Sequence, residues 1–346
     1  MNIIEDPKAE DLISPSHQVD RETVERLTVG RDQILAELSK VIVGQEQVIE
    51  QILITLLAGG HCLITGAPGL AKTLLVKSIA RIFHLKFQRI QFTPDLMPAD
   101  ITGTEILQDT GEGRRMMFVR GPIFAHMLLA DEINRTPPKT QAALLEAMQE
   151  HQVTAAGVRH ALEEPFFVLA TQNPIEMEGT YPLPEAQLDR FMFNVVMDYL
   201  PENDEVAVVT RTTSELPASI EALFTGEDVL RFHQLVRKVP VAEEIVRYAV
   251  RLAASSRPHQ PGAPDFMNEW ASWGAGTRAG QFLILGAKAR ALLKGRAYVT
   301  VEDIRILAYP VLRHRILLNY RAEAEGINVE NVIQRLLEAI KAPIGG

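Results

Sequence analysis

The sequence predicts an α/β fold, in which a parallel β-sheet is covered by helices and followed by a smaller helical domain. Between residues 61 and 196, short apolar runs alternate with amphipathic segments, as in parallel sheets that carry helices on both faces. The first run leads through a glycine-containing loop into a helical pattern, and β-type sequence ends after Pro201. With 346 residues, of which 47% are hydrophobic, the chain is long enough for two domains with apolar cores.

Five apolar runs are the predicted strands of the sheet. Each run is short and most are nearly uninterrupted, which is typical of strands that are buried on both faces. The runs occupy residues 62–65, 89–92, 127–130, 166–171 and 192–196. Two further segments, 101–119 and 153–162, interrupt the alternation and contain turn residues near their centres, so we expect each to form a hairpin insertion.

Three regions follow from these patterns. Residues 1–28 mix acids, prolines and polar residues, so we expect a loosely ordered N-terminal extension, with a first helix at 32–43. Residues 29–198 would form the α/β core, and residues 199–346 a small all-α second domain. The expected helices of this second domain lie at 228–239, 242–255, 280–294, 301–314 and 329–341. Thr300 and Asp303 form a capping-box pattern, and Asn328 is a suitable N-cap.

Composition excludes several classes of protein. No run approaches the roughly 18 apolar residues of a membrane span, and the first residues lack the pattern of a signal peptide, so we expect a cytoplasmic protein. Cys62 is the only cysteine, which leaves no intrachain disulfide, and its place in a predicted strand suggests a buried side chain. The net charge of −9 argues against nucleic acid as a partner.

A phosphate-binding loop lies between the first predicted strand and the following helix. Its residues are Gly66, Ala67, Pro68, Gly69, Leu70, Ala71, Lys72 and Thr73. In such a loop backbone N–H groups surround a β-phosphate, Lys72 bridges β and γ oxygens, and Thr73 can bind Mg²⁺. Ala71 stands where the pattern has glycine; we expect this to be tolerated, because a residue that enters a helix needs no positive φ. The alternative interpretation is an ordinary Gly/Pro turn.

Two acids follow the third predicted strand, and an amide follows the fourth. Asp131 and Glu132 would lie at the carboxyl end of the sheet, where open α/β sheets bind ligands. There Asp131 would hold Mg²⁺, directly or through water, and Glu132 would polarise the attacking water. Asn173 would reach the same edge and orient that water. The alternatives are a simple strand exit for the acids and a turn at Asn173-Pro174.

The motifs together resemble those of the AAA+ ATPases and, within them, the MoxR family. The matching segments are the phosphate loop, 131–135, 170–174 and 185–191, and the resemblance extends from about residue 29 to residue 340. Members of this family carry two hairpin insertions, like the two interruptions above. The resemblance implies a P-loop NTPase core of αβα layers with a parallel sheet, followed by a small all-α lid domain.

The resemblance also implies roles for residues outside the loop. Asn173 corresponds to sensor 1, and Arg190 to the arginine finger that reaches a neighbouring subunit's γ-phosphate. Arg278 corresponds to the sensor-2 arginine that the lid brings to the nucleotide. The residues expected near the adenine are Val43, Gly44 and Gln45. As alternatives, Arg190 would pair with a carboxylate such as Glu185, and Arg278 would be a solvated residue of a first helical turn.

The function implied by the resemblance is Mg²⁺-dependent ATP hydrolysis that drives chaperone-like remodelling or maturation of partner protein complexes. ATP or ADP and Mg²⁺ would be the cofactors, the chain would form a homo-oligomer, most simply a hexameric ring, and the client would be a separate protein, for instance one with a von Willebrand A domain. A DNA-stimulated motor is the first alternative, although the expected hairpins offer few basic residues. The second alternative is an ATP-sensing scaffold with little turnover.

Overall fold

The core of the computed structural model is a five-stranded parallel sheet. The model describes residues 16–110, 113–174, 179–214 and 218–343. The strands are β1 (Cys62–Gly66), β2 (Phe87–Gln91), β5 (Met127–Asp131), β8 (Phe167–Gln172) and β9 (Phe193–Met197). Their order is β2-β5-β8-β1-β9, and every pairing is parallel. The predicted α/β fold is therefore confirmed, and all five carboxyl ends lie at one edge of the sheet.

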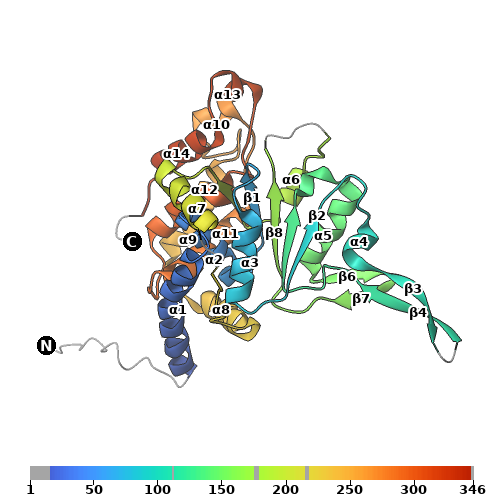
Figure 1. Ribbon diagram of the computed structural model, residues 1–346. Coiled ribbons are helices and arrows are strands. Elements are labelled where there is room, and N and C mark those ends of the chain that lie inside the picture. The colour runs from blue at the N-terminus through green and yellow to red at the C-terminus, as the bar shows by residue number, and fades with distance from the viewer. Residues whose placement is uncertain (1–15, 111–112, 175–178, 215–217, 344–346) are drawn as a thin grey trace.

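The two faces of the sheet are covered by different parts of the chain (Figure 1). Successive residues of β5 alternate between two apolar clusters: Met127 and Leu129 belong to one, and Leu128 and Ala130 to the other. The first cluster includes α2 (Glu46–Ala58), α3 (Lys72–Ile82) and most of the C-terminal helices, whereas the second includes α5 (Pro138–Glu150). This alternation explains why the strands read as continuous apolar runs.

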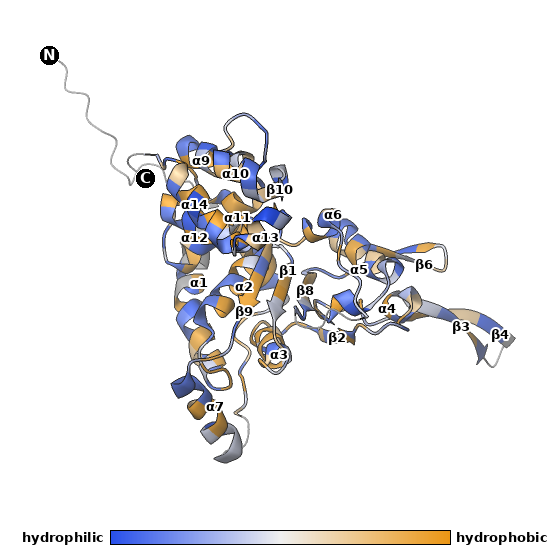
Figure 2. Cartoon of the chain, turned by 90° about the horizontal axis from the view of Figure 1, so that it is seen from above, coloured by the Kyte–Doolittle hydropathy of each residue, from blue (hydrophilic) through white to orange (hydrophobic). Residues whose placement is uncertain are grey.

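Both predicted hairpins are present. The first follows the short helix α4 (Pro98–Thr102) and consists of β3 (Gly103–Thr110) and β4 (Gly113–Arg120); the second consists of β6 (Gln152–Ala155) and β7 (Val158–Ala161). The β3–β4 hairpin extends away from the body of the molecule (Figure 2). At their bases, the rings of Phe118 and His160 stack with centroids 4.2 Å apart.

The C-terminal region is helical, as expected, and contains one short antiparallel strand pair. Its elements are α7 (Glu202–Ser214), α8 (Gly226–Lys238), α9 (Glu243–Ser255), α10 (Asp265–Trp270), β10 (Ala271–Trp273), α11 (Thr277–Leu293), α12 (Val301–Leu312), β11 (Leu317–Leu318), α13 (Tyr320–Ala324) and α14 (Val329–Ala339). Strands β10 and β11 pair. The sequence did not indicate these strands, because two or three residues are too few for a periodic pattern. Among the described residues, no helix has the length and apolar character needed to cross a membrane.

The N-terminal helix corrects the expected extension. Helix α1 (Ser16–Ser39) includes residues 16–28, which were expected to be loosely ordered, and it ends before the predicted boundary at 43. Its buried residues Leu27, Ile34 and Leu38 join the main apolar cluster, and Arg26 forms an ion pair of 2.8 Å with Asp228 of α8. Tertiary packing therefore stabilises a segment whose composition suggested little structure. Residues 1–15 lie outside the described part of the chain.

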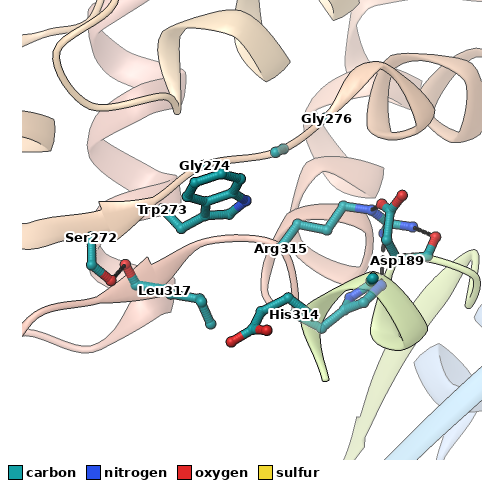
Figure 3. A pocket seen from close by; sticks show the side chains of 11 residues that line it. Asp189, Ser272, Trp273, Gly274, Gly276, His314, Arg315 and Leu317 are labelled. Atoms are coloured by element: carbon teal, nitrogen blue, oxygen red, sulfur yellow. Dashed lines mark hydrogen bonds and ion pairs between the residues drawn. The ribbon is translucent and has the colours of Figure 1, made fainter. Parts of the chain in front are cut away.

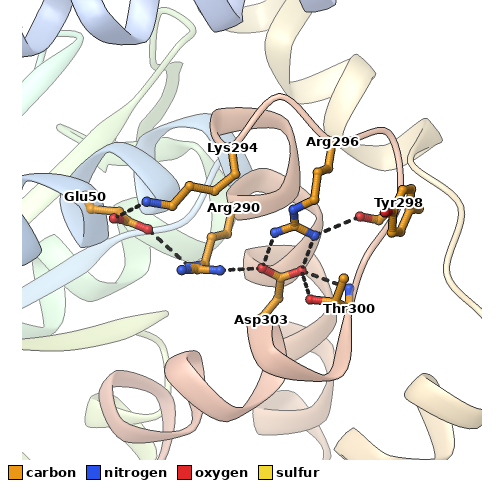
Figure 4. Close-up of polar contacts among 7 residues, drawn as sticks. All are labelled: Glu50, Arg290, Lys294, Arg296, Tyr298, Thr300 and Asp303. Carbon is orange, nitrogen blue, oxygen red and sulfur yellow. Dashed lines mark hydrogen bonds and ion pairs between the residues drawn. The ribbon is translucent and has the colours of Figure 1, made fainter. Parts of the chain in front are cut away.

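A buried acid connects the helices of the C-terminal region to the core (Figure 4). Asp303 is fully buried and accepts hydrogen bonds from Arg290, Arg296 and Thr300, which completes the predicted capping box. Burial alone would raise the pKa of Asp303, but these hydrogen bonds outweigh it and hold the pKa below its usual value. Arg290 also binds Glu50 of α2, at 3.1 Å, so the network links the two regions.

Replacement of Asp303 should therefore destabilise the whole chain. Asp303→Ala leaves Arg290 and Arg296, both partly buried, without their shared partner, and we expect the free energy of unfolding to fall by about 3 kcal/mol or more. Chemical denaturation at neutral pH measures the loss. Because the folded pKa is lowered, the contribution is present above the ordinary carboxyl pKa of about 4 and disappears as the pH falls below it. Glu302→Ala, an exposed neighbour in the same turn, is the control and should cost less than about 1 kcal/mol.

Candidate nucleotide-binding site

The phosphate loop joins β1 to α3 at the carboxyl edge of the sheet. Helix α3 begins at Lys72, and Gly69 has a positive φ of 86°, which glycine adopts without strain. Lys72 Nζ donates a hydrogen bond of 2.6 Å to the carbonyl oxygen of Gly66, so the ammonium group spans the loop. Burial lowers the pKa of Lys72, while the nearby carboxylates of Asp131 and Glu132 oppose that shift. An anion bound in this loop would contact the ammonium group of Lys72.

Ala71 adopts a conformation that the sequence argument did not anticipate. We expected no positive φ at this position, but Ala71 lies in the left-handed region, with φ 58° and ψ 26°, as the N-cap of α3. Because a Cβ atom is unfavourable in this region, alanine costs about 1 kcal/mol relative to glycine here. The expectation was wrong because the last residue before the helix must still turn the loop.

The two acids meet the phosphate loop as predicted, and each is already hydrogen-bonded. Asp131 Oδ1 accepts from the Thr171 hydroxyl at 2.6 Å, and the same hydroxyl accepts from the Glu132 backbone N–H at 2.8 Å. Asp131 Oδ2 accepts from Arg89, and Glu132 Oε2 from Gln91 at 2.9 Å. Glu132 itself has a positive φ of 58°.

The phosphate loop, the two acids and Asn173 converge on one cavity. A cavity of about 380 Å³ is lined by loop residues 68–73 together with Arg89, Asp131, Glu132 and Asn173. Asn173 is buried at the end of β8, so its amide reaches the same edge of the sheet. Thr73 and Asp131 both line this cavity, and hydroxyl and carboxylate oxygens are ligands that Mg²⁺ prefers. The donor set therefore fits Mg²⁺ bound beside a phosphate.

Residues 43–45 lie at the same edge. Gln45 Nε2 donates to the carbonyl oxygen of Asp198, at 3.0 Å, just beyond the end of β9. Strand β9 pairs with β1 so that Met197 is opposite Gly66, the first residue of the phosphate loop. A cavity of about 710 Å³ lies here and includes Gln45, Asp198 and Tyr199 in its lining. The expected position of Val43, Gly44 and Gln45 beside the adenine stays a prediction.

Arg190 and Arg278 lie at the opposite edge of the sheet. Arg190 precedes the amino end of β9, and its Nη1 donates to the carbonyl oxygen of Leu145, at 2.8 Å, rather than pairing with Glu185. Arg278, in the first turn of α11, pairs with Asp189 at 3.2 Å. The intervening strands separate this edge from the phosphate loop by at least about 15 Å. The lid therefore places Arg278 away from the phosphate loop of its own chain, and the expected contact of Arg278 with a nucleotide stays a prediction.

A second cavity, of about 610 Å³, adjoins these arginines (Figure 3). Arg315 is buried beside it and binds Asp189 Oδ1 at 2.7 Å and the carbonyl oxygen of Phe191 at 2.7 Å. Burial lowers the pKa of Arg315 to about 10, although the adjacent Asp189 opposes that shift. Asp189 and Phe191 are the neighbours of Arg190 in the sequence. Because Arg315 binds both of them, it fixes the segment that contains Arg190.

Three polar residues of the nucleotide site were not predicted. Arg89 and Gln91 occupy alternate positions of β2, and Thr171 lies near the end of β8; they bind the two acids directly. The signal in the sequence was the alternation of polar Arg89 and Gln91 with apolar Ile90 and Phe92. Its meaning depends on β2 lying beside β5, which local sequence does not specify.

A strand, a phosphate loop and a helix, with two acids and an asparagine at the same sheet edge, define a P-loop nucleotide-binding protein. Residues 61–193 match the model of the ATPase family associated with various cellular activities (AAA), and residues 268–336 match an AAA lid domain. The chain belongs to the MoxR family of AAA+ ATPases.

The relatives cover nearly the whole chain. Chaperone MoxR1 of Mycobacterium tuberculosis is 42% identical over 335 residues, which is 95% of this chain and 88% of that protein. Protein MoxR of Methylorubrum extorquens is 30% identical over 325 residues, covering 89% and 93% of the two chains. A crystal structure of a protein from Cytophaga hutchinsonii, assigned as an ATPase, has a TM-score of 0.88 at 40% identity and covers 95% of this chain and all of that one.

The conformation of Ala71 predicts an unusual effect of glycine. Ala71→Gly should relieve the left-handed strain and leave the free energy of unfolding unchanged or higher by up to about 1 kcal/mol. Ala142→Gly, at an exposed position within α5, is the matched control and should cost about 1 kcal/mol. Denaturant titration of both variants compares them. Equal losses would show that Ala71 does not have a left-handed conformation in solution.

Proposed function

We propose that this protein hydrolyses ATP with Mg²⁺ and uses the reaction to remodel partner protein complexes. The observation that carries the proposal is the convergence of Lys72, Asp131, Glu132 and Asn173 on the cavity at the phosphate loop. Each supplies a function that phosphoryl transfer to water requires: phosphate binding, metal binding, activation of water and its orientation.

The roles follow from the positions of these groups. The loop N–H groups and Lys72 would bind the β- and γ-phosphates, while Thr73 and Asp131 would hold Mg²⁺, which neutralises charge that develops on the phosphate oxygens. Glu132 would accept a proton from water, with Asn173 fixing the direction of attack. The carboxylate of Glu132 is now hydrogen-bonded to Gln91, so a bound water must compete with that contact.

Arg190 and Arg278 would complete the site of a neighbouring copy. They lie together beside Asp189, at the edge of the sheet that is remote from their own phosphate loop. A guanidinium from a second chain would stabilise the charge that the loop leaves unneutralised. If each chain offers a loop at one edge and arginines at the other, the contact is head-to-tail, and such contacts form a ring when the rotation between neighbouring chains closes. We propose a hexameric ring, as the resemblance to AAA+ ATPases implies.

The proposed client is a separate protein in the cytoplasm, for instance one that carries a von Willebrand A domain. Two observations support a protein client. The Mycobacterium tuberculosis relative is named a chaperone. In addition, the β3–β4 hairpin exposes apolar side chains that this chain does not cover, namely Ile106, Leu107, Met116, Met117 and Val119. A two-stranded ribbon of this kind is typically stabilised by something packed against it.

The hairpins offer little support for a DNA-stimulated motor. Arg114 pairs with Asp109 at 3.0 Å across the first hairpin, and His160 of the second is stacked on Phe118. A groove for the nucleic-acid backbone would require several cations directed at one path. The presence of Glu132, Asn173 and Arg190 argues against a scaffold that binds ATP without turnover.

Two substitutions separate binding from hydrolysis. Lys72→Ala should abolish ATP binding, because the loop loses its only side-chain cation, whereas Glu132→Gln should bind ATP and lose at least about 100-fold in turnover. Equilibrium binding of a fluorescent ATP analogue and phosphate release measure the two effects. Glu150→Gln, at the exposed end of α5, is the control and should match wild type. Normal turnover by Glu132→Gln would refute the assigned base.

A mixing experiment tests the contribution of Arg190 to a neighbouring site. Arg190→Ala and Lys72→Ala should each be inactive alone, the first while still binding ATP. Mixed rings contain some interfaces with an intact loop from one chain and Arg190 from the other, so mixing should restore part of the activity. Phosphate release across mixing ratios measures the recovery. If no ratio restores activity while both variants enter common oligomers, the assignment of Arg190 to a neighbouring site is wrong.

A further inference from the structure

Arg89 forms an ion pair with Asp131, the acid that would hold the metal. Its Nε and Nη2 atoms both donate to Asp131 Oδ2, at 3.0 and 2.6 Å. The side chain comes from β2, at the edge of the sheet, and lines the same cavity as the phosphate loop. Charge-assisted hydrogen bonds of this length are among the stronger polar contacts in proteins. The metal-binding acid therefore has a cationic partner before any metal arrives.

The register of the sheet directs Arg89 to this position. In the pairing of β2 with β5, Gln91 lies opposite Asp131 and Arg89 lies opposite Leu129. Arg89 and Gln91 share one face of β2, because Ile90 between them is buried in the apolar cluster on the other face. Arg89 thus reaches diagonally along this face to Asp131, and Gln91 binds Glu132 from the same face.

The burial of Asp131 explains why a partner is needed. The Asp131 side chain is 14% exposed, whereas that of Arg89 is 46% exposed. A carboxylate removed from water to this extent is costly unless it is paired. Its Oδ1 atom accepts from Thr171, and its Oδ2 atom accepts from Arg89, so both oxygens are engaged. Arg89 keeps enough contact with solvent to move away at modest cost.

We propose that Arg89 is a placeholder cation, which pairs with Asp131 in the nucleotide-free protein and is displaced when Mg²⁺ binds with the nucleotide. This inference rests on the proposed Mg²⁺-dependent nucleotide site. Mg²⁺ and the guanidinium compete for one carboxylate, so breaking the ion pair lowers the apparent affinity for the metal. Arg89 is thus a positioning residue that sets the Mg²⁺ concentration at which the nucleotide is held firmly.

The test is the Mg²⁺ dependence of ADP binding, which involves no turnover. The affinity of full-length protein for a fluorescent ADP analogue is measured in EDTA and over a series of free Mg²⁺ concentrations. The ratio of the two limiting affinities reports the coupling between metal and nucleotide. In Arg89→Gln the metal no longer displaces a cation, so the ratio should rise by about three- to tenfold, and half-saturation should move to lower Mg²⁺. Arg89→Lys keeps the charge and should remain within about twofold of wild type.

Two controls isolate the contact with Asp131. Arg81→Gln removes the same charge at an exposed position in the last turn of α3 and should leave the ratio unchanged. In an Asp131→Asn background, Arg89→Gln should also change nothing, because the competition has been removed. Thermal unfolding of each variant verifies that the fold is retained.

The outcomes distinguish this inference from the proposed function. An unchanged or lower ratio in Arg89→Gln would overturn the placeholder role. An equal loss of ADP affinity with and without Mg²⁺ would overturn it too, since Arg89 would then be a phosphate ligand. If wild-type protein binds no ADP under any condition, the proposed nucleotide site itself fails.

Discussion

The common direction of the five strands is the constraint on which the whole arrangement depends. The strands β1, β5 and β8 end at one edge of the sheet. The phosphate loop, the two acids and Asn173 lie at or directly after these strand ends, so they come together at that edge. The same direction places Arg190, which precedes β9, at the other edge. Under the proposed function, one chain carries a phosphate-binding half of the site at one edge and an arginine half at the other. Two chains, in contact edge to edge, would supply one complete site.

Ion pairs help to hold the segment that carries Arg190 and the first turn of α11. Arg315 binds Asp189, which also pairs with Arg278, so the segment carrying Arg190 and the first turn of α11 share one acid. At the other end of α11, Arg290 connects Asp303 to Glu50 in the core. Helix α11 is thus fastened at both ends. Together with the apolar packing of the helix, these ion pairs fix its orientation and the position of Arg278.

Local sequence was sufficient for the strands, the hairpins and the nucleotide edge, because continuous apolar runs and a glycine-containing loop have few alternative structures. It was not sufficient where packing between distant segments decides the outcome. Leu27 makes α1 a packed helix, although its neighbours suggested an extension. Ala71 takes a positive φ to complete the loop. Arg278 lies far from its own phosphate loop, and Arg89 reaches Asp131 only because β2 lies beside β5.

The central claim, that a nucleotide site is complete only between two chains, is tested most directly by ATP turnover per subunit as a function of protein concentration. The assay contains Mg²⁺ and no DNA, and mass photometry reports the oligomers present at each concentration. We expect turnover per subunit to be negligible where monomers dominate, to climb steeply as larger assemblies form, and then to saturate. A turnover per subunit that stays constant down to concentrations at which only monomers are present would contradict the account.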